Sequence, residues 1–97
     1  MLSRLNDRLI NNLISTLTSI NDKEQCASFL EDLCTPGEIK TMAQRLEVAK
    51  LLDDGLVYSE IAQKTGSSTA VISRVKRALD YGSGGYRSII DKLDGEH

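Results

Sequence analysis

The stretch "SEIAQKTGSSTAVISRVKRAL", residues Ser59 to Leu79, decides the fold that we predict for this chain. It places Gly66 between two short segments in which apolar residues recur with helical spacing. The whole chain has a formal net charge of −2, yet this stretch is locally basic. Its one acid is Glu60, and its cations are Lys64, Arg74, Lys76 and Arg77.

The two segments have the pattern of a helix-turn-helix. Ile61 and Ala62 point into the crevice between the predicted helices, and the small Ala62 lets them cross closely. Gly66 permits the left-handed residue that reverses the chain. Ile72 and Val75 close the crevice from the second helix. An ordinary helix hairpin with a solvated charged face is the alternative.

The second predicted helix, residues 68–80, has an outward face suited to a DNA major groove. On a helical projection, small polar side chains and arginines cluster opposite Ile72, Val75 and Leu79. Small side chains let the backbone approach base edges, and guanidinium groups reach phosphates or guanine. The predicted DNA-binding residues are Ser67, Ser68, Thr69, Ala70, Ser73, Arg74, Lys76 and Arg77.

Every other periodic segment is also helical, so we predict an all-α fold of about six helices. "TPGE" begins a helix, with Thr35 as cap, Pro36 in the first turn and Glu38 completing a capping box. Gly55 is placed to end it. Its predicted buried face is Ile39, Met42, Leu46, Ala49 and Leu52. The glycines of "YGSGGY" end the 68–80 helix, and Tyr86, Ile89, Ile90 and Leu93 mark a last amphipathic segment.

The N-terminal helix carries more apolar residues than a small monomer can bury. Ninety-seven residues form one small domain, which removes only about 60–65% of its extended-chain surface from water. We therefore expect this helix to pair with a second copy, with a private core helix as the alternative. Its stripe is Leu2, Leu5, Leu9, Leu13, Leu17 and Ile20, widened by Ile10 and Ile14.

Composition excludes several classes of protein. No apolar run approaches the roughly 18 residues that span a bilayer, so we expect a cytoplasmic protein with no membrane partner. Cys26 and Cys34 lack metal-ligand spacing and a companion histidine, so we expect buried, reduced thiols and no metal or cofactor. An enzyme is the least supported class, because His97 is the only histidine and no strand precedes a glycine-rich loop.

The chain resembles the Trp repressor family from about Leu33 to Leu79. The resemblance rests on "LCTPGE", Arg45, Gly55 and "GSSTAVISR", and the whole chain is similar to Trp-repressor-related proteins of Gram-positive bacteria down to "YGSGGYRSIIDKL". It implies an intertwined homodimer whose two recognition helices meet double-stranded DNA. It also implies a single domain over 1–97, with dimerisation helices in 1–33, a core helix in 34–57, the helix-turn-helix in 58–80, and a glycine loop with a C-terminal helix in 81–97.

The resemblance also implies a candidate effector pocket. In the family, two arginines sandwich L-tryptophan, and they match Arg45 and Arg74. Thr35 matches another lining position. Val75 instead stands where the family has glycine, and Ala78 replaces a serine, so the ligand could be L-tryptophan, another small molecule or none. A salt bridge to Glu38 or Glu47 is the alternative role for Arg45.

These observations favour a sequence-specific transcriptional regulator, a repressor that binds a two-fold-related operator as a homodimer through the major groove. The competing hypothesis is a protein-interaction module in which the helix-turn-helix docks a partner protein. The negative net charge of the chain and the lack of a basic arm favour this second hypothesis.

Overall fold

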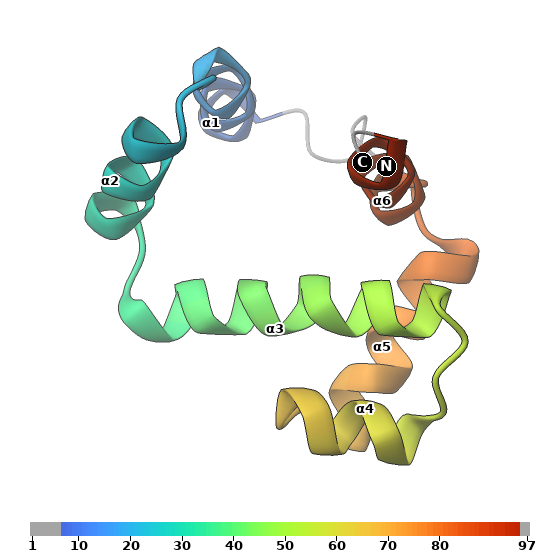
Figure 1. Cartoon of the computed structure of the whole chain (residues 1–97). Helices are drawn as coiled ribbons and strands as arrows, with labels where there is room; N and C mark the ends of the chain where they lie inside the picture. The colour runs from blue at the N-terminus through green and yellow to red at the C-terminus, as the bar shows by residue number, and fades with distance from the viewer. Residues whose placement is uncertain (1–6, 96–97) are drawn as a thin grey trace. The chain divides into compact units, whose positions relative to one another are not determined.

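The computed structural model describes residues 7–95 and contains six α-helices in that range, with no strand there. This confirms the predicted all-α fold. The chain forms two compact units that divide between Ile39 and Lys40. The helices in Figure 1 are α1 (Arg8–Ser19), α2 (Lys23–Leu33), α3 (Pro36–Asp53), α4 (Tyr58–Thr65), α5 (Thr69–Tyr81) and α6 (Gly85–Gly95).

The first unit contains α1 and α2, which begin at aspartate caps. Asp7 accepts a hydrogen bond from the Leu9 amide at 2.7 Å, and Asp22 accepts one from the Gln25 amide at 2.9 Å. Neither helix contains a buried residue. The two Cys residues are half-buried free thiols, so burial is less complete than we predicted. Leu2 and Leu5 of the predicted stripe lie outside the described residues.

Helix α3 begins with the capping box predicted from "TPGE". The Thr35 amide donates to Glu38 Oε1 at 2.8 Å, and the Glu38 amide donates to Thr35 Oγ1 at 3.1 Å. These bonds satisfy two amide groups near the helix start. The hydrogen bond from the Thr35 backbone, and then that from its side chain, lower the pKa of Glu38 below its ordinary value of 4.5.

The lowered pKa makes the start of α3 pH-dependent. Because the folded state favours ionised Glu38, its contribution is present above the unfolded pKa and is lost as the pH falls through the folded pKa. Glu38→Gln keeps an acceptor but removes the titration. We expect the wild type to exceed this variant in urea-unfolding free energy at neutral pH, and the difference to shrink as the pH falls below 4.5 and through the lower pKa of the folded state. A pH-independent difference would contradict this assignment.

Helix α3 ends at a Schellman motif centred on Gly55. The Gly55 amide donates to the Leu52 carbonyl at 3.0 Å, and the Leu56 amide donates to the Leu51 carbonyl at 3.1 Å. Gly55 has a φ of 88°, in the left-handed region that a side chain disfavours. The predicted stop of this helix at Gly55 is confirmed, and the chain turns from here into α4.

The second unit has a core to which four helices contribute. Helix α5 packs against both α4 and α6, and lies between their labels in Figure 1. Ile61, Ile72 and Val75 are buried, which confirms the predicted crevice of the helix pair. The complete buried cluster is Val48, Ala49, Ile61, Ile72, Val75, Leu79 and Ile90.

The predicted buried face of α3 was only partly right. Ala49 is fully buried, but Met42 is 45% exposed, and the fully buried Val48 was not predicted. Helix α3 has apolar residues on several sides, so its sequence does not mark one stripe that must face the core. The other helices of the second unit pack around Val48 and Ala49, and this packing decides which side of α3 is buried.

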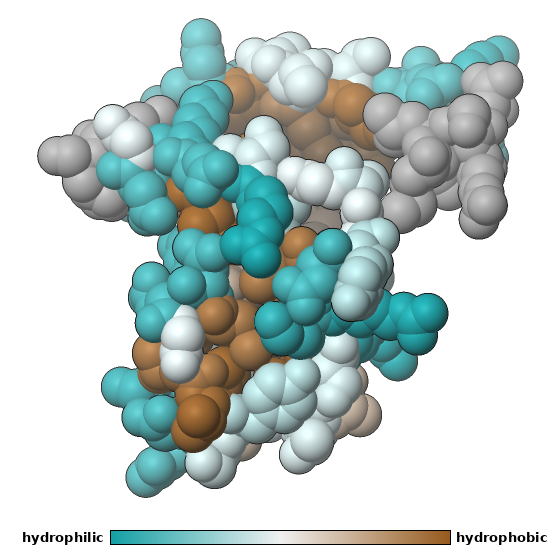
Figure 2. All heavy atoms as spheres, turned by 90° about the vertical axis from the view of Figure 1, so that its right-hand side faces the viewer, coloured by the Kyte–Doolittle hydropathy of each residue, from teal (hydrophilic) through white to brown (hydrophobic). Residues whose placement is uncertain are grey.

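Apolar side chains also remain at the surface, where brown areas interrupt the teal in Figure 2. Within the described part, no helix is both long and apolar enough to cross a bilayer. The large exposed apolar residues are Leu9, Leu13, Ile14, Leu17, Leu33, Met42, Val57, Tyr81 and Ile89.

Candidate nucleic-acid interface

The turn between α4 and α5 sets the start of the predicted recognition helix. Helix α4 ends at Gly66, whose φ of 74° lies in the left-handed region, and the Gly66 amide donates to the Ala62 carbonyl at 2.9 Å. Ser68 then caps α5, because its Oγ accepts from the Val71 amide at 3.2 Å. The left-handed glycine that we predicted for the turn is therefore confirmed, and α5 begins with a side-chain cap.

The polar face of α5 points to solvent in the second unit. Ile72, Val75 and Leu79 hold the opposite side in the core. The first turn of α5 carries the small residues, and the arginines follow one and two turns later. An approaching duplex would thus meet small side chains first and cations next. The exposed residues on this face are Thr69, Ala70, Ser73, Arg74 and Arg77.

Ser67 does not fit its predicted place in this interface. The residue is only 8% exposed, and its Oγ is buried without a hydrogen-bond partner among the described residues. Its amide donates to Thr65 Oγ1 at 3.2 Å, which holds the turn so that the Ser67 side chain faces inward. The Ser67 side chain is therefore not at the surface in this conformation, and its contact with DNA stays a prediction.

An ion-pair network occupies the flank of α5. Lys76 Nζ lies 3.0 Å from Asp80 Oδ2, one helical turn away. Arg87 Nη2 of α6 lies 3.6 Å from Asp80 Oδ1, and Arg87 Nη1 lies 2.6 Å from Asp53 Oδ1 of α3. Lys76 is therefore already paired in the free protein. Arg74 and Arg77 have no ion pair among the described residues.

The predicted effector residues differ in their burial. Val75 is 2% exposed and belongs to the core, where its side chain occupies space. Ala78 and Arg45 are half-buried, whereas Arg74 is exposed. Arg45 makes no ion pair with Glu38 or Glu47 among the described residues, so its alternative role gains no support. Thr35 belongs to the first unit and caps α3.

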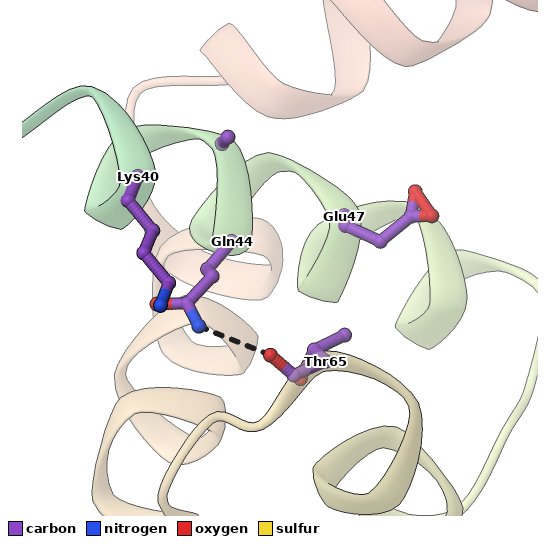
Figure 3. Close-up of a pocket in the computed structure, with 5 residues that line it drawn as sticks. Lys40, Gln44, Glu47 and Thr65 are labelled. Atoms are coloured by element: carbon purple, nitrogen blue, oxygen red, sulfur yellow. Dashed lines mark hydrogen bonds between the residues drawn. The ribbon is translucent and has the colours of Figure 1, made fainter. Parts of the chain in front are cut away.

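A cleft that we did not predict lies between α3 and the end of α4. It has a volume of about 250 Å³, and Gln44 Nε2 donates to the Thr65 carbonyl at 3.0 Å beside it (Figure 3). None of the predicted effector residues lines it. Its lining residues are Lys40, Ala43, Gln44, Glu47 and Thr65.

Only some of the contacts that we did not predict have a signal in the sequence. Lys76 and Asp80 are four residues apart on one helix, a spacing typical of an ion pair, so this contact could have been predicted. Gln44 meets Thr65 across 21 residues, and Arg87 meets Asp53 across 34. No local pattern indicates contacts at such separations.

Within residues 7–95, no group of three or more His, Cys, Asp or Glu residues could hold a metal ion.

The polar groups on the exposed face of α5 are hydroxyls and guanidinium groups. These groups donate hydrogen bonds to phosphate and base edges. The arrangement is therefore suited to binding a polyanion by its shape and charge.

Comparison with known proteins gives matches over nearly the whole chain. The sequence model of the family described as "Trp repressor protein" matches residues 8–94. YerC, an uncharacterized protein of Bacillus subtilis (strain 168), is 44% identical over 92 residues, which cover 95% of this chain and 88% of that protein.

Two crystal structures are similar to the described fold. One, from Staphylococcus aureus and described as a candidate Trp repressor, is 38% identical with a TM-score of 0.91, covering 97% of this chain and 94% of that one. The other, a TrpR-like protein from Eubacterium eligens ATCC 27750, is 41% identical with a TM-score of 0.90, covering 95% of each chain. The likeness thus includes the helix-turn-helix and the helices around it.

Proposed function

Because the chain belongs to the Trp repressor family, a family of DNA-binding regulators, we propose that it represses transcription by binding a two-fold-related operator as a homodimer. The observation that carries this proposal is the solvent-facing polar side of α5, with its small residues at the helix start and unpaired arginines further along. The site of action would be the cytoplasm, where bacterial DNA is found.

In the proposed complex, the α5 helix of each protomer enters the major groove. Thr69 and Ala70 would lie nearest the base edges, because short side chains allow a close approach. Arg74 and Arg77 would neutralise phosphates and release counterions, so that affinity falls steeply with salt. Two such helices about 34 Å apart would read half-sites one helical turn apart.

The proposed homodimer is supported by the first unit. Its helices bury no residue, although α1 carries a stripe of leucines and isoleucines. An exposed stripe of large apolar side chains favours association with another protein surface, because water is displaced from both surfaces. A second copy of the chain supplies an identical stripe, and this self-complementarity is what a two-fold interface requires.

We expect Leu13→Asp to weaken the dimer by about 10-fold or more, because the carboxylate would lose water without gaining a partner. Sedimentation equilibrium at several concentrations measures the change. Ser15→Asp, on the other side of α1, is the matched control and should leave the dimer intact. Equal dissociation constants for the wild type and the Leu13 variant would exclude this face of α1 from the interface.

The candidate effector site has little room for L-tryptophan. Val75 fills core space at the position where the family has glycine, which disfavours an indole between Arg45 and Arg74. We propose that DNA binding does not require L-tryptophan. Titration of the protein with L-tryptophan by calorimetry should give no heat of binding, and the DNA affinity should be the same with and without it.

The experiment that tests the proposed function is electrophoretic mobility shift with pooled genomic fragments of the source organism, followed by sequencing of the retained DNA. We expect a small set of fragments that share a two-fold-related site. Failure to retain any fragment at low salt, with or without added amino acids, would overturn the proposal. That outcome would favour docking of a partner protein by the helix-turn-helix.

A further inference from the structure

A glutamine from α3 reaches the turn that precedes the recognition helix. The Gln44 side chain is half-buried, and its Nε2 donates to the Thr65 carbonyl at 3.0 Å, as the dashed line in Figure 3 shows. The same Nε2 atom lies 3.8 Å from the position that a Cβ on Gly66 would occupy. Gln44 therefore lies beside Gly66 as well as donating a hydrogen bond to Thr65.

The acceptor of this bond is a carbonyl at the end of α4. Carbonyl groups in the last turn of a helix have no partner within the helix, because the chain turns away before one can be supplied. Gly66 ends α4 here, and the amide of Gln44 provides the missing donor. The bond joins two helices across 21 residues, so it constrains their relative position.

Thr65 passes this constraint to the start of α5. Its hydroxyl donates to the Ile61 carbonyl at 2.8 Å, and the same oxygen accepts from the Ser67 amide at 3.2 Å. The next residue, Ser68, caps α5. These hydrogen bonds, together with the backbone of residues 65–68, thus connect Gln44 to the first turn of the recognition helix.

We propose that Gln44 is a positioning residue for DNA recognition, which acts by holding the turn through the Thr65 carbonyl so that the first turn of α5 is ordered before DNA arrives. This inference rests on the proposed function of α5 in DNA binding. Without the bond, the buried cluster still holds α5 at Ile72, Val75 and Leu79, but the helix start loses its polar tie to α3. The helix start then becomes ordered only when DNA binds, and the entropy lost in this step lowers the affinity.

The test uses two variants that remove the bond in different ways. Gln44→Met has similar length but no donor, and Gln44→Asn keeps the amide but is one methylene too short. Gln63→Met is the matched control, since Gln63 is exposed on α4 and makes no side-chain hydrogen bond among the described residues. Each protein is measured for duplex affinity, for the salt dependence of that affinity, for its urea midpoint and for amide hydrogen exchange at Ser67.

We expect both Gln44 variants to lose about 3- to 10-fold in affinity, the range of one neutral hydrogen bond. Exchange at the Ser67 amide should accelerate, with the urea midpoint and the salt dependence close to those of the wild type. A role confined to overall stability would lower the urea midpoint and leave the affinity of the folded fraction unchanged.

Three results would overturn the inference. Wild-type exchange at Ser67 in both variants would mean that Gln44 does not hold the turn. Faster exchange with unchanged affinity would mean that the turn does not matter for binding. A changed sequence preference at one base pair would mean that Gln44 touches DNA directly. If the wild type bound no duplex, the proposed function would fail, while the exchange data would still show whether Gln44 holds the turn.

Discussion

Ile72→Ala is expected to lower the unfolding free energy by about 2–5 kcal/mol, the range for removing a large aliphatic side chain from a packed core. Ile72 is fully buried between α4 and the other helices of the second unit. A domain of this size has only about 5–15 kcal/mol of stability in total, so the expected loss is a large fraction of it.

Urea unfolding followed by circular dichroism measures this loss. Val57→Ala is the control, because Val57 is 58% exposed and its truncation should cost less than about 0.5 kcal/mol. A loss at Ile72 no larger than that at Val57 would show that the crevice between the two helices is not the core of this unit.

Replacing both Arg74 and Arg77 with alanine is expected to lower duplex affinity by about 100-fold or more at low salt, because two charge-assisted interactions with phosphate are removed. The reduction should be similar for every DNA sequence, and the slope of log affinity against log salt should fall by about two. Fluorescence anisotropy with a fixed duplex over a series of salt concentrations gives both quantities.

Two control variants separate charge from sequence recognition. Lys76→Ala should have a smaller effect, since Lys76 is paired with Asp80 before DNA binds. Thr69→Ala should alter the preferred sequence instead, at a cost of about 1–3 kcal/mol for each interaction with a base that is removed. An affinity of the double arginine variant equal to that of the wild type would remove the outward side of α5 from the interface.

Local features could be predicted from residues close together in the chain. Thr35 and Glu38 form the expected capping box, and Gly55 and Gly66 have the left-handed backbone that their positions indicated. The crevice residues Ile61 and Ile72 are buried as predicted. Such features depend on bonds and spacings of a few residues, which the chain specifies before any helix packs against another.

The helical architecture, its caps and the division of α5 into an apolar and a polar side were thus determined by the sequence alone. The tertiary structure decided the rest: that Val48 is buried while Met42 is exposed, that Ser67 faces inward, and that Gln44 holds Thr65. The physical reason is that these outcomes depend on which helices meet. The residues next to Gln44 or Val48 in the sequence are the same whether or not a distant helix packs against these side chains. The local sequence therefore does not show which side chains gain such a contact.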